Sequence, residues 1–554
     1  MTRAMKLRGG RYQGHLMARA ALIRRTDTLE FVADVLVIGG GPAGAWAALT
    51  ARTAGCEVIL VDKGFFGTSG ATAPSNTETW LVPPGAARQT AIERHIAKTR
   101  SLCDSGHVDE VLDRSYDALN RLAALSYPFP LDAGGRPYLG NLRGPDYMRF
   151  MRRRVIGAGV RVLDHHPALC LLGDRDGVGG AQGVDRQLGT PWTARASAVV
   201  LASGGCAFGE RFIGSTGLTG DGLLMAVEAG AEVSGMEMSS QYAVTPAGTS
   251  LNKGMPFRFA TFFDANGGEM GDLGDDRQVA IASAMLRGPV FARLDKASPS
   301  ERDMLRRGQP NCFLPYDRLG IDPFRDKFEI TLRCEGTVRG AGGVRLSSKN
   351  GGTGVPGLYA AGDVASRQDL VGAMTGGGGP NSSWAIASGI RAGEAAGDEA
   401  RRNRAARDRR SPAPLGTIAM RPARRGSGSP APSDVVAAVR THMLPLSSNF
   451  YRTEQGLGRS RAALDDLWRG ITQDDRGTKR SKAAPETIRH REAAAMLACA
   501  RWAVASAVVR RDSRGMHRRT DFPGFRADAP RRLYAKGLTA IEVSSDGQIW
   551  SAAL

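Results

Sequence analysis

A short glycine-rich segment constrains this chain more than any other feature. It follows an apolar run at residues 35–38, which is typical of a buried parallel strand, and it opens a stretch of small residues that favours a helix. A second apolar run at residues 57–61 ends next to an acid, Asp62. Strand, glycine turn, helix and strand predict a βαβ unit that binds a dinucleotide. The segment that fits G-x-G-x-x-G is Gly39-Gly40-Gly41-Pro42-Ala43-Gly44.

The glycines of this pattern have separate physical roles. Gly39 allows the tight turn, Gly41 lets the backbone approach a pyrophosphate, and Gly44 lets helix and strand pack closely. The phosphate is expected on the helix N-terminus, where unpaired N–H groups and the positive end of the helix dipole lie. Asp62 should accept hydrogen bonds from the ribose of the adenosine half. The expected contacts of this unit are Gly39, Gly41, Pro42, Ala43, Gly44 and Asp62.

The pattern alone does not distinguish FAD from NAD, but three later segments favour FAD. A dinucleotide that lies extended through a domain needs close approaches at several strand ends, and a ribityl chain needs an acceptor such as Asp363. Each junction alone reads as an ordinary strand-to-turn connection, whereas all three in this order indicate FAD. The residues concerned are Ala202, Gly204 and Gly205 after one strand, Asp221 at a helix start, and Gly362 and Asp363 after another strand.

The organisation of the chain indicates a split domain. At 554 residues it is long enough for two or three domains with their own cores. The βαβ pattern is lost over residues 236–351, so the predicted class is α/β: a Rossmann-type FAD-binding domain interrupted by an inserted α+β capping domain and followed by a helical C-terminal domain. The expected divisions are residues 1–30 (disordered basic extension), 31–235 with 352–409 (FAD-binding), 236–351 (inserted), 410–433 (linker) and 434–554 (helical, with a small terminal sheet).

Cysteine usage and charge exclude several classes of protein. The seven cysteines are scattered and never spaced C-x-x-C, so the sequence predicts no metal site and a reducing cytoplasm. No run reaches the roughly 18–20 apolar residues of a membrane span. Much of the formal net charge of +19 falls in residues 1–25 and 401–425, which read as solvated tails or linkers. Neither segment interleaves aromatic residues, which argues against specific nucleic-acid binding.

Together these motifs resemble the flavoprotein subunits of succinate dehydrogenase and fumarate reductase, with L-aspartate oxidase and the flavoprotein subunit of adenylylsulfate reductase as relatives. The resemblance extends from about residue 33 to about residue 525, apart from the linker. It is specific for the family and not for one activity. The matching pieces are residues 39–44, 62–63, 68–71, 166–169, 202–205, 219–222, 357–363, 381–383 and 512–517.

The resemblance implies roles for particular positions around FAD. Ala168 would meet the adenine through its backbone, and the helix that opens at residues 381–383 would point its N-terminus at the flavin C2 carbonyl. Positive potential there stabilises the anionic reduced flavin. Gly70 stands where respiratory members carry the histidine that bonds covalently to flavin, so the FAD should be non-covalent. The further FAD contacts implied are Lys63, Ser69, Gly70, Ala71, Asn381, Ser382 and Ser383.

The departures from the family pattern concern its substrate residues. The histidine expected after residues 237–241 is replaced by Tyr242, and the arginine expected after Gly268-Glu269 is replaced by Met270. The histidine expected shortly before Gly342-Gly343 is absent from residues 338–341, and the stretch 372–380 has no arginine. A desolvated dicarboxylate needs cationic or donor partners, so succinate or fumarate chemistry is disfavoured.

Two residues remain as candidate catalytic groups. Tyr242 would donate or relay a proton, and Arg339 would hold an anionic group. The alternatives stay open: a tyrosine after a strand often packs with a satisfied hydroxyl, and an arginine near glycines is often a surface charge. Thr375 and Arg258 lie in the same expected region. His517 is expected to be structural, within a segment that docks the C-terminal helices.

These observations lead to one functional hypothesis with two alternatives. We expect a FAD-dependent oxidoreductase that passes hydride between a small molecule and flavin N5. Without an iron–sulfur centre in this chain, electrons would leave to oxygen, to a soluble acceptor or to a separate electron-transfer protein. The alternatives are a flavoprotein subunit resembling that of adenylylsulfate reductase, and a flavin-binding protein that has lost its catalytic residues.

Overall fold

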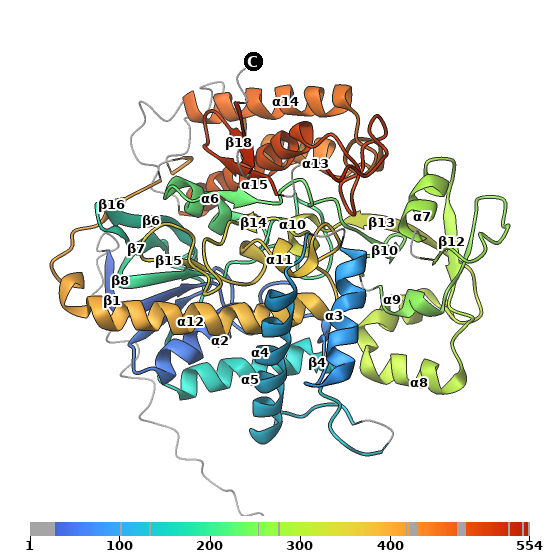
Figure 1. Ribbon diagram of the computed structural model, residues 1–554, viewed down its shortest axis with the longest axis horizontal. Coiled ribbons are helices and arrows are strands. Elements are labelled where there is room, and N and C mark those ends of the chain that lie inside the picture. Colours follow the sequence, from blue (N-terminus) through green and yellow to red (C-terminus); the bar gives the residue numbers. More distant parts are fainter. Residues whose placement is uncertain are drawn as a thin grey trace, which may run out of the picture.

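A mixed sheet of eight strands forms the centre of the molecule (Figure 1). The computed structural model describes residues 28–99, 102–131, 134–252, 254–274, 277–416, 418–420, 429–473, 484–529, 532–545 and 548–551. The strand order is β16-β6-β7-β8-β1-β2-β5, and β15 pairs with β8. The strands are β1 (Leu29–Ile38), β2 (Val58–Val61), β5 (Arg161–Leu163), β6 (Ala168–Asp174), β7 (Gly177–Val184), β8 (Pro191–Leu201), β15 (Leu358–Ala360) and β16 (Ala413–Pro414).

The parallel part of this sheet is the predicted nucleotide fold. β1 pairs in parallel with β2 and β8, and β15 and β5 extend the parallel set on either side. Because parallel strands buried on both faces need apolar residues throughout, residues 35–38 form an unbroken buried run. The strand begins earlier than the apolar run suggested, since Leu29 already pairs with Trp192. Most of the predicted N-terminal extension, residues 1–27, lies outside the described residues.

Helices cover the central sheet. The long helix α12 (Gly379–Arg407) packs against α2 (Pro42–Thr53), the helix of the βαβ unit. A Cβ at Gly389 would lie 2.4 Å from the carbonyl oxygen of Ala43, and one at Gly393 would lie 2.5 Å from that of Ala47. Small residues therefore let α12 and α2 approach closely. The helices of this domain are α2 (Pro42–Thr53), α3 (Ala86–Lys98), α4 (Ser105–Ala124), α5 (Gly144–Gly157), α6 (Asp221–Glu228), α11 (Gln368–Val371) and α12 (Gly379–Arg407).

The arginine-rich end of α12 is not the solvated segment that its composition indicated. Arg404 and Arg407 both pair with Asp34, whose side chain is 1% exposed. Asp34 also accepts a hydrogen bond of 2.8 Å from the backbone N–H of Glu57. These arginines therefore compensate a buried carboxylate and fix the end of α12 on the sheet.

Residues 242–334 form a second body with its own core, at the right of Figure 1. Its four-stranded sheet has the order β10-β13-β12-β11. Aromatic side chains, among them Phe257, Phe262 and Phe328, fill a separate core between this sheet and its helices. The elements are β10 (Tyr242–Pro246), β11 (Thr261–Phe263), α7 (Arg277–Met285), β12 (Val290–Arg293), α8 (Pro299–Gly308), α9 (Pro310–Leu319) and β13 (Phe328–Cys334). The short helix α10 (Gly336–Arg339) follows β13 and contacts residues 362–364 of the FAD-binding domain.

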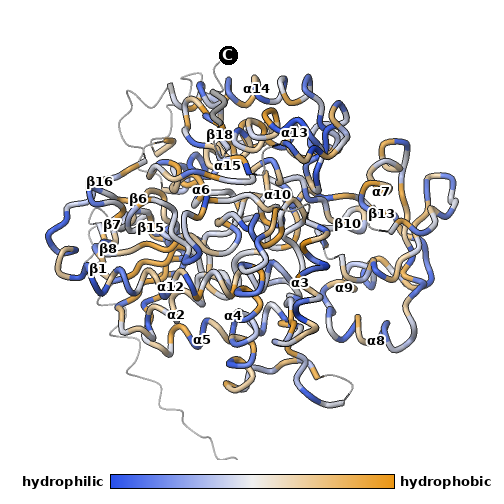
Figure 2. The backbone as a smooth tube through the Cα atoms, viewed as in Figure 1, coloured by the Kyte–Doolittle hydropathy of each residue, from blue (hydrophilic) through white to orange (hydrophobic). Residues whose placement is uncertain are grey.

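The C-terminal part is helical and lies at the top of Figure 1. It contains α13 (Pro432–Met443), α14 (Glu454–Gln473) and α15 (Ala484–Val509). In Figure 2 the outer helix α14 alternates between hydrophilic and hydrophobic positions, as expected of a helix with one face in solvent. By length and composition α15 would suffice to cross a membrane, but 83% of its most apolar window is buried within the protein. It is a core helix.

A third sheet joins distant parts of the chain. Its order is β14-β9-β17-β18-β19, so the terminal strands do not form a sheet of their own. A separate two-stranded ribbon, β3 with β4, lies beside α12. The strands of these two sheets are β3 (Asn76–Glu78), β4 (Asn141–Arg143), β9 (Val233–Ser234), β14 (Gly343–Val344), β17 (Tyr534–Lys536), β18 (Glu542–Ser545) and β19 (Gln548–Ser551).

Candidate active site

One cavity of about 450 Å³ extends from the glycine turn after β1 to the inserted body. Its walls include most of the residues for which the sequence predicts cofactor contacts. Gly44, Gly205 and Ser383 are the predicted residues that do not line it. The predicted residues that do are Gly39, Gly41, Pro42, Ala43, Asp62, Lys63, Ser69, Gly70, Ala71, Ala168, Ala202, Gly204, Asp221, Gly362, Asp363, Asn381 and Ser382.

The glycines of the turn differ in what surrounds them. Gly39 has φ +109, and a Cβ there would lie 2.4 Å from the carbonyl oxygen of Ala202. A Cβ at Gly44 would lie 1.8 Å from the carbonyl oxygen of Gly39, so this glycine serves close packing. Gly41, the N-cap of α2, has nothing within 4 Å of that position. The space in front of Gly41 is therefore open to a ligand at the helix N-terminus.

Asp62 is buried at the end of β2 and organises the turn. Its two oxygens accept hydrogen bonds from the backbone N–H groups of Gly40 and Gly64, both at 2.7 Å, and from the Ser69 hydroxyl at 2.9 Å. A carboxylate has about four acceptor positions, so one remains for a hydroxyl donor in the cavity. Asp62 can thus hold the loop and a ribose at once.

Lys63 links the same end of the cavity to the C-terminal helices. Its ammonium lies 2.6 Å from Asp221, at the start of α6, and 3.0 Å from Glu492 on α15. Burial alone would lower the pKa of Lys63, but the two carboxylates outweigh it and raise the pKa above its ordinary value. The other oxygen of Asp221, Oδ1, is buried and has no hydrogen-bond partner within the described part of the chain.

Two predicted contacts fall just outside the cavity for identifiable reasons. A Cβ at Gly205 would lie 2.6 Å from the Thr337 hydroxyl, so this glycine makes room for α10. The Ser383 hydroxyl accepts a hydrogen bond of 3.1 Å from the backbone N–H of Trp80, because this serine lies on the side of α12 that faces the loop after β3. Asn381 and Ser382, the two residues immediately before it, line the cavity.

Arg367 is a central residue that the sequence did not point to. Its side chain is fully buried, and it donates to Asp363 and Asn381, both expected to contact FAD. It also donates to the carbonyl oxygens of Gly340, Thr337 and Val338 at 2.7–2.9 Å. All three nitrogens of the guanidinium therefore donate hydrogen bonds. These bonds connect the cofactor end of the cavity to α10.

The far end of the cavity gathers three arginines from different elements. Arg258 and Arg277 come from the inserted body, and Arg339 ends α10. Burial lowers the pKa of Arg277, and the positive charge of the nearby Arg258 lowers it further. Arg258 pairs with Glu78 at 3.3 Å. Convergent guanidinium groups in a cavity are suited to bind an anion.

The interpretation of Tyr242 as a catalytic group does not agree with its position. Its side chain is buried away from the cavity, and its hydroxyl donates to the carbonyl oxygen of Leu444 at 2.9 Å. Burial raises the pKa of Tyr242 well above its ordinary value. The preceding residue, Gln241, lines the cavity instead, because neighbouring residues in extended chain face opposite sides.

The segment in which the family pattern places an arginine, directly after Gly268-Glu269, also lies outside the cavity. Gly268 and Glu269 sit in an exposed turn after β11, and Met270 is not part of the cavity wall. Arg277, seven residues after Met270, is the inserted-body arginine that reaches the cavity from the start of α7. The only sequence signal for it was an arginine at the start of a predicted helix.

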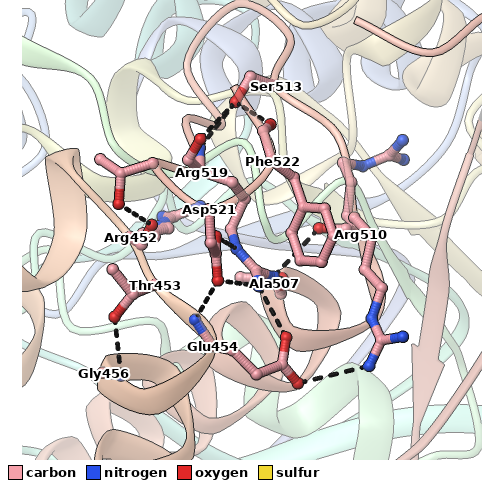
Figure 3. Close-up of polar contacts among 12 residues, drawn as sticks. Arg452, Thr453, Glu454, Gly456, Ala507, Arg510, Ser513, Arg519, Asp521 and Phe522 are labelled. Carbon is pink, nitrogen blue, oxygen red and sulfur yellow. Dashed lines mark hydrogen bonds and ion pairs between the residues drawn. The ribbon is translucent and has the colours of Figure 1, made fainter. Parts of the chain in front are cut away.

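The segment 512–517 docks the C-terminal part onto the other domains. Arg452 donates to His517 Nδ1 at 2.7 Å, and burial together with this arginine holds the pKa of His517 well below its ordinary value. Figure 3 shows the neighbouring contacts, in which Arg519 pairs with Asp521 and with Glu454 at the start of α14. The backbone N–H of Met516 donates to Ala373 at 2.9 Å. His517 is neutral and held between protein groups.

The cavity can be tested for its fit to FAD. Gly41 and Gly70 both face open space, where a ligand has room to approach the backbone. Two buried polar atoms at the cavity, Asp221 Oδ1 and Ser203 Oγ, have no hydrogen-bond partner among the described residues. A ribose hydroxyl would donate to Asp221, and a phosphate oxygen or a hydroxyl would accept from Ser203. A phosphate turn that opens into a cavity reaching a second body defines a FAD-dependent oxidoreductase.

Comparisons with known proteins agree with this class. A family model for the FAD binding domain matches residues 34–255, and one for the fumarate reductase flavoprotein C-terminal domain matches residues 443–544. The chain therefore belongs to the succinate dehydrogenase and fumarate reductase flavoprotein family, as its motifs indicated, and FAD is its cofactor. The predicted α/β fold class is confirmed.

Several relatives have similar identity but different names. An L-aspartate oxidase of Streptomyces coelicolor is 28% identical over 384 residues, or 60% of this chain and 63% of that protein. In Mycobacterium tuberculosis, an L-aspartate oxidase is 28% identical over 91% of this chain and 95% of its own length. A fumarate reductase flavoprotein subunit from the same organism is 28% identical over 88% and 92%. Equal similarity to differently named proteins does not select a substrate.

Solved structures share the fold. A mutant of E. coli quinol fumarate reductase superposes with a TM-score of 0.78 and 20% identity, covering 94% of this chain and 96% of that one. The adenylylsulfate reductase of Archaeoglobus fulgidus gives 0.77 and 17% identity, covering 96% and 98%. At this identity the likeness concerns the fold alone.

Proposed function

We propose that this protein transfers hydride between non-covalently bound FAD and a small anionic molecule. The observation that carries the proposal is the continuous cavity that begins at the phosphate turn and ends among Arg258, Arg277 and Arg339. Bound FAD would supply the hydride chemistry at its flavin ring. The protein would supply binding, orientation and exclusion of water.

The three arginines would hold the anionic part of the substrate. Arg339 lies at the wall shared by α10 and the glycine run 376–379, next to the predicted flavin contacts Asn381 and Ser382. Arg258 and Arg277 approach from the inserted body, so the substrate would lie between the two bodies. Val338 and Met255 give the same end of the cavity apolar walls. This mixture suits a molecule with one charged and one less polar end.

We propose that the substrate is neither succinate nor fumarate. The family positions for two substrate histidines carry no histidine here: Val338 stands at the approach to Gly342-Gly343, and Gln241 and Tyr242 stand after β9. Three arginines still reach the cavity, so an anionic substrate is retained while the pattern of hydrogen-bond partners differs. Partner geometry of this kind decides which anion binds.

We further propose that a separate electron-transfer protein receives the electrons in the cytoplasm. The seven cysteines are buried free thiols, which suits a reducing compartment, and they form no group of three or more metal-ligating residues in the described part of the chain. Solved proteins with this fold include quinol fumarate reductase and adenylylsulfate reductase. This supports the alternative of a flavoprotein subunit in such a complex.

An anaerobic screen tests the proposal. The purified protein is mixed with anionic metabolites, and bleaching of the oxidised flavin is followed by absorbance, with reduced viologen as donor for the reverse direction. We expect bleaching with at least one carboxylate, and none in Arg339→Met. Fast reoxidation by air would favour oxygen as the acceptor, and slow reoxidation would favour a partner protein. Absence of bleaching with all anions, together with bleaching by a cationic or neutral metabolite, would contradict the anionic substrate.

A further inference from the structure

The Arg339 side chain forms an ion pair with the buried carboxylate of Glu335. Its Nε lies 3.3 Å from Glu335 Oε1, one turn earlier, and the Glu335 side chain is 1% exposed. The amide of Asn252 donates to the same oxygen at 2.6 Å, and this residue is also 1% exposed. A buried carboxylate is stable only with such partners, so the pair fixes one orientation of the guanidinium.

Since Nε of Arg339 is the atom that faces Glu335, Nη1 and Nη2 remain for another acceptor. Within the described part of the chain neither atom donates a hydrogen bond to the protein, and Arg339 lines the cavity. The terminal nitrogens are therefore available to an anion in the cavity.

The glycine run that replaces the expected arginine makes room for this side chain. A Cβ at Gly377 would lie 2.9 Å from Arg339 Cδ and 3.1 Å from the Thr375 hydroxyl. Gly376 leaves space for Arg367 in the same way, since a Cβ there would lie 2.2 Å from Arg367 Nε. The backbone is tied as well, because the Gly376 N–H donates to the Arg339 carbonyl at 2.8 Å. The glycine run at residues 372–380 has no arginine of its own, and Arg339 from α10 supplies the positive charge beside it.

We propose that Glu335 is the positioning residue that, with Asn252 and Gly377, directs Arg339 at the substrate anion. The inference rests on the proposed function, in which this end of the cavity binds an anion. Glu335 acts through Arg339 and does not itself touch substrate. It lowers the rotational freedom of a long side chain before binding, so less entropy is lost when the anion arrives.

The experiment measures oxalate binding to the FAD-loaded protein through the change in flavin absorbance. Glu335→Asp keeps the charge but withdraws the carboxylate by one methylene, and Gly377→Ala displaces Arg339 without altering any polar group. We expect each to weaken oxalate binding by about tenfold, and Arg339→Met by more. The matched control Glu329→Asp changes an exposed residue of β13 and should leave the dissociation constant unchanged. FAD content and thermal unfolding are recorded for every variant.

A double variant separates positioning from general stability. If Glu335 acts through Arg339, then adding Glu335→Asp to Arg339→Met should weaken oxalate binding no further. Additive losses, or unchanged binding in both Glu335→Asp and Gly377→Ala, would overturn the inference while leaving the anion site intact. No oxalate binding by the unmodified protein would instead contradict the anion site, and the inference would fall with it. Should Glu335→Asp fail to fold, Gly377→Ala and Arg339→Met still decide the question.

Discussion

The two ends of the cavity are built from different parts of the polypeptide. At the cofactor end the backbone makes the site: Gly39, Gly41 and Gly44 shape one turn within six consecutive residues. At the other end, where we propose that the substrate binds, long side chains line the cavity, and Arg258, Arg277 and Arg339 come from three separate elements. A site made by the backbone of a few consecutive residues depends on one short sequence motif. In a site made by converging side chains, single residues can be substituted without changing the fold.

The sharpest test of the backbone-built end is Gly41→Val. Gly41 has φ −72 and ψ −176, which a valine adopts without strain, and nothing lies within 4 Å of its Cβ position. Loss of FAD would therefore come from the added side chain alone. We expect complete loss of the flavin absorbance after gel filtration. Gly157→Ala, at an exposed glycine that ends α5, is the control and should keep its flavin. Retained flavin in Gly41→Val would show that the phosphate lies elsewhere.

A second test of this end concerns how FAD is attached. Gly70 faces open space with φ +81 and has no nucleophilic side chain. Acid precipitation should therefore release all of the FAD into the supernatant, where its absorbance is measured. Flavin that stays with the pellet would mean that another residue forms a covalent bond.

The substrate end is tested by turnover of the dicarboxylates of the family. Loss of one positioned donor costs on the order of a hundredfold in rate, and several expected donors are replaced here. We expect turnover well below about one per second, the lower part of the usual range for enzymes. The assays use succinate with an artificial acceptor and fumarate with reduced viologen. Faster turnover would show that Arg258, Arg277 and Arg339 replace the expected residues fully.

Arg367 joins the two ends, and its replacement should affect both. Arg367→Lys keeps the charge but loses the planar set of donors that reaches Asp363, Asn381 and three carbonyl oxygens. We expect FAD to bind about tenfold more weakly, measured by flavin fluorescence. Arg306→Lys, in an exposed pair with Asp317, is the control for the same exchange. Equal FAD affinity in all three proteins would limit Arg367 to packing.

The smallest effect is expected far from both ends, at Arg404. Its side chain is half-exposed, and Asp34 retains Arg407 as a second partner, so Arg404→Ala should lower the free energy of unfolding only slightly. FAD binding should not change. Asp34→Ala should cost more, about 3 kcal/mol, because it leaves two arginines without their shared carboxylate. Urea unfolding monitored by circular dichroism compares the two, and the reverse order would contradict this account.

The sequence pattern located residues that line the first end of the cavity but not all of those that line the second, for physical reasons. Glycines in a turn and an acid at a strand end act through their immediate neighbours, so residues 39–44 and Asp62 could be placed from spacing alone. Tyr242 was misplaced by a single position, because one residue of slip in extended chain reverses the face and Gln241 lines the cavity instead. Arg367 could not be found at all, since its partners lie up to 30 residues away and meet only in the folded protein.

The sheet in which β9 pairs with β17 affects how the protein can fold during translation. Ser234 pairs with Tyr534, so about 300 residues separate two neighbouring strands. The cofactor turn, encoded near the start, can form early, but this sheet stays incomplete until nearly the whole chain has been synthesised. A nascent chain would therefore expose the unpaired edge of β9 for most of its translation, and a chain stopped before residue 534 would never cover it.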